Sequence, residues 1–142
     1  MMKKSLIILV IVFLASTSVS AESSLNIEIF DINKGGVVMR VPTNSFVQEE
    51  AKNNLQGITN VYGKFKPIPK EGYMIRIPLE PSIQLQNQWI NQAVDQVIIL
   101  FPVDEKPFLL VLDDGGKPIF FSFEGKNEAL LKTIKNYSSD VA

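Results

Sequence analysis

The chain has 142 residues, a formal net charge of −1, and neither cysteine nor histidine. This length suits a single domain that buries its core without disulfides, and the absence of a basic cluster argues against binding to nucleic acid. Without these residue types, Ser-His-Asp and Cys-His catalysis and histidine-ligated zinc or copper are impossible within the chain. We expect no cofactor and no metal.

The N-terminal 21 residues have the three-part layout of a secretory signal peptide. Two lysines precede an apolar run from Leu6 to Ala15, and small residues lead to Ala21. We expect cleavage after Ala21, which leaves residues 22–142 as one secreted or extracytoplasmic domain with no transmembrane segment. The alternative is a retained anchor, but a helix of about ten residues spans only about 15 Å of a hydrocarbon core of about 30 Å. Export without cysteine fits a bacterial protein.

The domain is predicted to begin with a β-hairpin. Apolar and polar residues alternate over residues 25–31 and again over residues 37–41, with Gly35 and Gly36 between the two runs. Period-two runs around a Gly-Gly turn are typical of paired antiparallel strands. We expect Pro42 to end the second strand.

Residues 43–56 are predicted to form a helix. Ser45 and Gln48 match a capping box, and Gly57 is placed to end the helix in a left-handed conformation. The apolar positions recur at helical spacing at Val47, Ala51 and Leu55. Residues 59–72 are rich in turn formers and predict no convincing element.

The next segment alternates again over residues 73–79. Proline cannot donate to a β-ladder, so Pro78 predicts either an edge strand or the end of this one. Residues 83–97 fit either a strand, a turn and a strand, or a short helix. We favour the two strands.

The centre of the sheet is predicted by two runs that are apolar at every position, residues 97–101 and 108–112. A strand with one wet face would alternate, so both runs should be buried on both faces. Asp113–Gly116 predicts a hairpin turn into residues 118–123 and lacks the spaced ligands of a calcium loop. Residues 126–137 form an amphipathic helical pattern.

Together these elements predict an α+β fold, an antiparallel β-meander of about six strands with two amphipathic helices. If both helices cover the same face of the sheet, the other apolar face needs a cover. The first hairpin is one candidate, and a second copy of the chain, which would make a homodimer, is another.

The segment Phe108–Tyr137, FLLVLDDGGKPIFFSFEGKNEALLKTIKNY, resembles the strand–turn–strand–helix ending of small uncharacterised exported proteins of Gram-positive bacteria. The likeness covers about 30 residues and rests on pattern. The resemblance implies an exported protein and a topology, but no activity.

The stretch Ile77–Gln92, IPLEPSIQLQNQWINQ, is rich in amides and contains the single tryptophan. Amides supply paired donors and acceptors, and an indole offers a large apolar area with one N–H, a combination that suits sugars and extended peptides. The predicted ligand-binding residues are Trp89, Asn87, Gln88, Asn91 and Tyr73. The alternative is that Trp89 belongs to the core and the amides decorate an edge strand.

The sequence thus predicts an exported, non-catalytic binding or interaction module of the bacterial cell envelope or medium. The expected partner is a protein, a peptide or a cell-wall glycan. One alternative is a carboxylate-based hydrolase acting on wall glycan, and another is a self-associating structural protein. Carboxylates are available by type only, at Glu80, Asp95, Glu105, Asp113 and Asp114. No catalytic residue is assigned.

Overall fold

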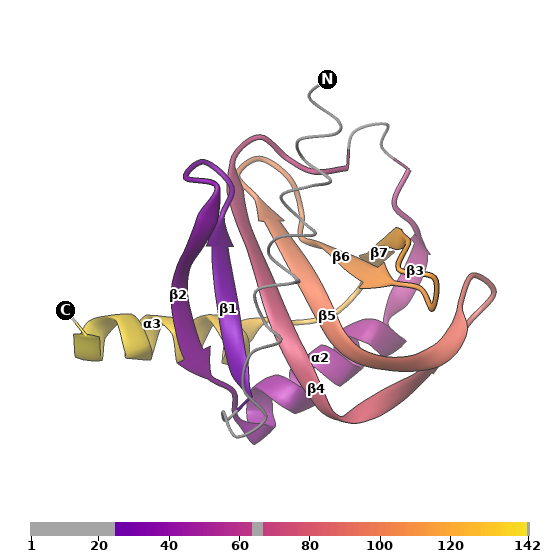
Figure 1. Ribbon diagram of the computed structural model, residues 1–142, viewed down its shortest axis with the longest axis horizontal. Helices are drawn as coiled ribbons and strands as arrows, with labels where there is room; N and C mark the ends of the chain where they lie inside the picture. Colours follow the sequence, from indigo (N-terminus) through magenta and orange to yellow (C-terminus); the bar gives the residue numbers. More distant parts are fainter. Residues whose placement is uncertain (1–24, 64–66, 142) are drawn as a thin grey trace.

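The computed structural model describes residues 25–63 and 67–141, and the predicted signal peptide lies outside them. In chain order, the elements are β1 (Asn26–Asp31), β2 (Gly36–Pro42), α2 (Ser45–Gln56), β3 (Ile58–Val61), β4 (Gly72–Gln86), β5 (Asn91–Pro102), β6 (Phe108–Leu112), β7 (Pro118–Phe123) and α3 (Glu128–Val141). The strands pair antiparallel in one sheet, in the order β2-β1-β4-β5-β6-β7-β3 (Figure 1). The predicted α+β class is confirmed. None of the helices in the described ranges is long and apolar enough to cross a membrane.

The described sheet has seven strands against about six predicted: β3 was not expected, and the two strands predicted at residues 73–79 and at the start of residues 83–97 form one strand, β4. The residues of β3 are mostly exposed and show no alternation that would predict a strand. The strand forms because α2 ends beside β7. The N–H of Glu124 donates to the carbonyl of Gly57 at 2.9 Å, and the N–H of Tyr62 donates to the carbonyl of Phe120 at 2.8 Å.

The N-cap of helix α2 is Asn44 and not the predicted Ser45, which is the first residue of the helix. The side chain of Asn44 accepts a hydrogen bond from the N–H of Val47 at 2.9 Å. Gln48, the expected second member of a capping box, instead donates to the carbonyl of Pro78 at 2.7 Å. The capping-box prediction is therefore wrong, and Gln48 connects α2 to β4.

The predicted left-handed conformation of Gly57 is also wrong, because its φ is −89°. A side chain is excluded for a different reason, since a Cβ on Gly57 would clash with the carbonyl oxygen of Glu124. Glycine at this position allows the backbone after β7 to approach the end of α2.

Strand β4 runs through Pro78 and Pro81, so the prediction that Pro78 ends it is wrong. It lies between β1 and β5 in the sheet. Pairing with β1 reaches only Arg76, so Pro78 lies beyond the β1 ladder and its missing N–H removes no bond there. The register with β5 shifts between Pro78 and Ile83. Both halves of the segment 83–97 are extended, as predicted.

Both helices cover one face of the sheet (Figure 1), and the apolar residues form a cluster on each face. The helix-side cluster includes Val47, Ala51, Leu55 and Leu130 from the helices. The second cluster consists of the buried residues Phe30, Met74, Ile98, Leu100, Phe108 and Leu110. Strands β5 and β6 contribute to both clusters, which confirms that they are buried on both faces.

The first hairpin is part of the cover of the second cluster, through Ile32 and Val37. Tyr62 also packs here, with its ring stacked on Phe108 at 3.9 Å between centroids and 5° between planes. Helix α3 contributes only to the other cluster, and its C-terminal turns extend past the edge strand β2 (Figure 1). The sequence pattern places Leu130, Leu131, Ile134 and Tyr137 on the apolar face of this helix; Leu130 is buried, whereas Leu131 and Tyr137 are exposed.

Candidate functional site

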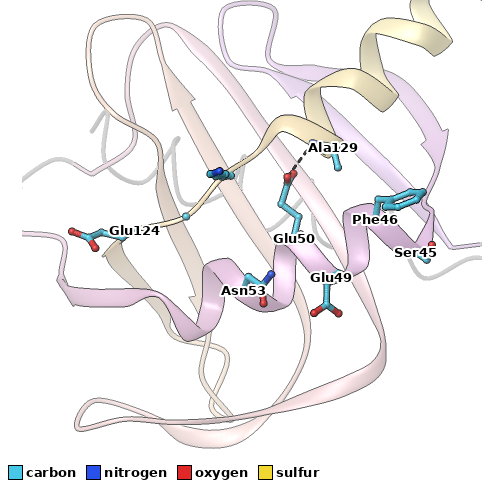
Figure 2. A pocket seen from close by; sticks show the side chains of 9 residues that line it. Ser45, Phe46, Glu49, Glu50, Asn53, Glu124 and Ala129 are labelled. Atoms are coloured by element: carbon cyan, nitrogen blue, oxygen red, sulfur yellow. Dashed lines mark hydrogen bonds between the residues drawn. The ribbon is translucent and has the colours of Figure 1, made fainter.

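A surface groove lies between α2 and the segment that leads into α3 (Figure 2). Its volume is about 460 Å³. One wall comes from α2 and the other from residues 124–129. The α2 wall consists of Ser45, Phe46, Glu49, Glu50 and Asn53.

The register of α2 determines which side chains reach the groove. Val47, Ala51 and Leu55 are buried against the sheet. An α-helix turns 100° per residue, so Phe46 and Glu50, each one residue before a buried position, lie on the flank of the buried face. Phe46 and Glu49 are three residues apart and are therefore neighbours on the helix surface.

Glu50 fixes the second wall of the groove by capping α3. The backbone N–H of Ala129 donates to Oε2 of Glu50 at 3.0 Å, and the N–H of Leu130 donates to Oε1 at 2.9 Å. Figure 2 shows the first of these bonds. A carboxylate at a helix N-terminus satisfies unpaired N–H groups and interacts favourably with the helix dipole. Both carboxylate oxygens of Glu50 thus serve to cap α3.

A second contact between α2 and the start of α3 lies beneath the groove. Asn54 is fully buried, and its Nδ2 donates to Oδ1 of Asn127 at 2.7 Å. The Asn54 Oδ1 atom has no hydrogen-bond partner in the described part of the chain, and a Cβ on Gly125 would clash with it. Glycine at position 125 therefore lets the chain cross closely over Asn54.

Phe46 is the most exposed large apolar side chain of the described residues, at 75 %. It lies at one end of the groove, and Glu124 lies at the other (Figure 2). A phenylalanine side chain brings a large apolar area to any contact that buries it. The structure thus presents an apolar anchor point at the mouth of a preformed hollow.

The charge of the groove is acidic. Glu49 and Glu124 are exposed, and neither forms a salt bridge anywhere in the described part of the chain. Lys126 is the one cation of the lining, against the three carboxylates of Glu49, Glu50 and Glu124. A hollow lined by one sign of charge attracts groups of the opposite sign.

The predicted site residues around Trp89 lie together at the tip of the β4–β5 hairpin. Trp89 is half-buried, packs against the helix-side cluster, and lies 6.0 Å from the ring centroid of Phe121. Asn87 Oδ1 accepts from the N–H groups of Trp89 and Ile90, at 2.8 and 3.0 Å. This bonding is an Asx turn that shapes the hairpin tip.

The remaining predicted residues differ in position. Asn91 Oδ1 accepts from Nε2 of Gln84 across the hairpin at 3.0 Å, and Gln88 is exposed at the tip. Tyr73 lies at the opposite end of β4, paired with Phe101 of β5. The structure therefore brings together four of the five predicted residues and leaves Tyr73 apart from them.

Another hollow, of about 490 Å³, lies beside Tyr62 and the β5–β6 connection. The Tyr62 hydroxyl donates to Oε1 of Glu105 at 2.7 Å. The pKa of Tyr62 is raised from 10.0 to about 12, mainly by burial and further by the hydrogen bond to Glu105 and the nearby charges of Glu105 and Asp104. Glu105 thus stabilises a neutral phenol.

The described ranges contain no group of three or more Asp, Glu, His or Cys residues that could hold a metal ion. The turn Asp113–Gly116 uses its first carboxylate for the backbone. Asp113 Oδ1 accepts from the N–H groups of Gly115 and Lys117, at 2.9 and 2.8 Å. These bonds fit the predicted hairpin turn.

The sequence contained a usable indication of the α2 groove. Phe46 falls outside the apolar stripe of its helix, and two glutamates follow within four residues. The second wall had no such indication, because it depends on α3 docking beside α2.

Comparisons of the chain with protein-family models, with curated proteins and with solved structures found no match. The resemblance of Phe108–Tyr137 to exported Gram-positive proteins therefore stays a prediction.

Proposed function

We propose that this protein is an exported, non-catalytic binding module of the bacterial cell envelope or medium, and that it holds a peptide segment of a partner protein in the α2–α3 groove. One observation carries the proposal. Phe46 is 75 % exposed at the groove, with Glu49 beside it and Glu124 at the far end, and neither carboxylate has an ionic partner within the described ranges.

The side chains of the groove define the chemistry of the ligand. An apolar side chain placed on Phe46 would remove apolar area from water on both partners. A lysine or arginine next to it would approach Glu49, and an arginine can also stack on the Phe46 ring. A second cation further along the peptide would approach Glu124. The ligand class is therefore a peptide that combines an apolar residue with basic ones.

The same geometry argues against a carboxylate-based hydrolase. Both Glu50 oxygens accept backbone hydrogen bonds from the start of α3. Of the carboxylates that the hydrolase alternative names, Asp113 accepts two backbone hydrogen bonds in its turn and Glu105 accepts the hydroxyl of Tyr62.

Export is supported by the layout of residues 1–21, and the lack of cysteine in an exported chain fits a bacterial source. Intact mass measured on protein recovered from a bacterial host's envelope or medium should correspond to a chain that begins at Glu22. A mass that retains the leader would contradict this part of the proposal.

Fluorescence anisotropy with labelled peptides tests the binding function. The probe peptide alternates phenylalanine or leucine with lysine and arginine, and the comparison peptide carries glutamates at the basic positions. Phe46→Ser should raise the Kd for the basic peptide by about tenfold or more, since interface aromatics contribute strongly. Val103→Ser is the matched control, because Val103 is also exposed, at 72 %, but lies outside the groove.

Charge reversal gives an independent arm of the same experiment. Glu49→Lys should weaken binding of the basic peptide and strengthen binding of the acidic one, whereas Glu71→Lys should change neither. Equal binding of both peptides to the unmodified protein would contradict the proposal. So would equal effects of Phe46→Ser and Val103→Ser, or binding of wall-glycan fragments that Phe46→Ser leaves unchanged.

A further inference from the structure

A row of charged side chains crosses three strands on the sheet face opposite the helices. Glu28 of β1 pairs directly with Arg40 of β2 on one side and with Arg76 of β4 on the other. Glu28 is two residues from Phe30, a member of the second cluster, and alternate residues of a strand share a face. The row therefore lies beside that cluster and away from the α2–α3 groove.

The carboxylate of Glu28 is shared by two guanidinium groups. Nε of Arg40 donates to Oε2 at 2.7 Å, and Nε of Arg76 donates to Oε1 at 2.9 Å. The side chains of Glu28 and Arg76 are only 3 % and 10 % exposed. Two cations and one anion leave this cluster with an unbalanced positive charge, which is unfavourable when it is withdrawn from water.

The two arginines differ in how many of their donors are used. Arg76 also donates through Nη1 to Oε1 of Gln96 at 3.3 Å and through Nη2 to the carbonyl of Asn26 at 3.5 Å. Within the described residues, Arg40 bonds through Nε alone, and its side chain is 53 % exposed. A guanidinium has five N–H donors, so the two Nη groups of Arg40 offer unpaired ones.

We propose that Arg40 is the anchor of an oxyanion-binding site, and that Glu28 and Arg76 are its positioning residues. The bond from Nε to the buried Glu28 restricts the rotamers of Arg40 before any ligand arrives. A guanidinium fixed in this way loses less conformational entropy on binding. The pair of Nη groups matches a carboxylate or phosphate group in bidentate geometry, and the positive charge of Arg76 behind Glu28 adds to the attraction.

The proposed ligand is an oxyanion of the phosphate or carboxylate class. One half-exposed guanidinium, that of Arg40, supports a Kd of roughly 1 mM for a free ion. The site would therefore recognise a phosphate or carboxylate group that is part of a larger ligand. This inference does not depend on the α2–α3 groove, which lies on the helix-bearing side of the sheet and has the opposite charge.

Titration of the ¹⁵N-labelled 142-residue chain tests the proposal through the Nε–Hε resonances of its arginines. Sodium phosphate and sodium acetate are compared with sodium chloride at equal ionic strength. Phosphate or acetate should produce a saturable shift of the Arg40 resonance, and chloride should not. A tighter response to phosphate assigns a phosphate-type ligand, and a tighter response to acetate assigns a carboxylate; either supports the site.

Arg40→Lys keeps the charge but removes the fork, and it should weaken the response, followed on the backbone amide of Val41, by at least about fivefold. Lys34→Gln removes an exposed cation from the turn of the same hairpin and should leave the response unchanged. Equal shifts with chloride, or equal responses of the unmodified and Arg40→Lys proteins, would overturn the inference.

Discussion

At the scale of single residues, Glu49 and Glu50 are neighbours on α2 with opposite roles. Glu50 points toward α3 and caps it, whereas Glu49 lies at the outer rim of the groove and its side chain is directed away from α3 (Figure 2). The 100° turn per residue of the helix produces this difference. The Glu50 carboxylate therefore holds the two walls of the groove together, and the Glu49 carboxylate is available to a ligand.

Replacing Glu50 should destabilise the fold, and replacing Glu49 should not. Glu50→Ala leaves the first N–H groups of α3 without an acceptor, and loss of a helix cap lowers the free energy of unfolding by about 1–2 kcal/mol. Glu49→Ala should change it by less than about 0.5 kcal/mol. Urea denaturation of both variants measures the difference, and equal midpoints would show that the cap contributes nothing.

Glu28 is the residue whose loss the sheet should tolerate least. Glu28→Gln would leave the buried Arg76 guanidinium without a counter-charge, which lowers the free energy of unfolding by about 3–5 kcal/mol. Arg40→Gln removes a half-exposed partner and should change it by less than about 1 kcal/mol. Thermal and urea unfolding should rank the two variants in this order. A larger effect of Arg40→Gln would contradict the assigned burial.

Tyr62 should make stability depend on pH in the alkaline range. Its pKa rises from 10.0 to about 12 in the folded protein, so between these values the folded state keeps a proton that the unfolded chain has lost. The resulting stabilisation is complete below pH 10 and is lost as the pH rises through 12. The urea midpoint of the unmodified protein should fall toward that of Tyr62→Phe over this range, and a constant difference between the two would contradict the prediction.

At the scale of elements, close backbone crossings hold α2, β3 and α3 together. The crossing at Gly57 leaves no room for a Cβ beside the Glu124 carbonyl. Gly57→Ala needs no unusual φ, but it would push the end of α2 away from β7. Overpacking of this kind lowers the free energy of unfolding by about 1–3 kcal/mol.

Gly36→Ala is the control for this prediction, because nothing lies within 4 Å of a Cβ there and its φ is not positive. It should be neutral or slightly stabilising. Chemical denaturation of the two alanine variants compares them directly. Equal stability of the two proteins would show that the crossing at Gly57 adapts at no energetic cost.

These elements differ in how far the sequence could predict them. The first hairpin, the buried strands β5 and β6, and the hairpin turn at Asp113 follow from local alternation, apolar runs and turn residues. The cap of α2 is local, but it is Asn44 and not the predicted Ser45. β3 and the capping of α3 could not be predicted in this way. They depend on contacts between segments distant in the chain, such as Glu50 with Ala129. The groove shows the same difference. Its α2 wall comes from one predicted helix, whereas its second wall depends on the docking of α3 beside α2.

At the scale of the whole molecule, the two candidate sites lie on opposite sides of one sheet. The helix side carries an acidic groove with an exposed phenylalanine, and the other side carries a positively charged row beside an apolar cluster. Both outer strands, β2 and β3, contain a register shift. Such irregular edges discourage sheet extension, so we expect partners to use the helix surface rather than a strand edge.

Backbone amide mapping by NMR tests the role of the groove most directly. The ¹⁵N-labelled 142-residue chain would be titrated with the unlabelled peptide of alternating apolar and basic residues. The largest shifts should fall on Phe46, Glu49 and residues 124–129, and Phe46→Ser should abolish them. Shifts centred on the hairpin tip at Asn87–Asn91, or no saturable shift at all, would contradict the assignment of the groove.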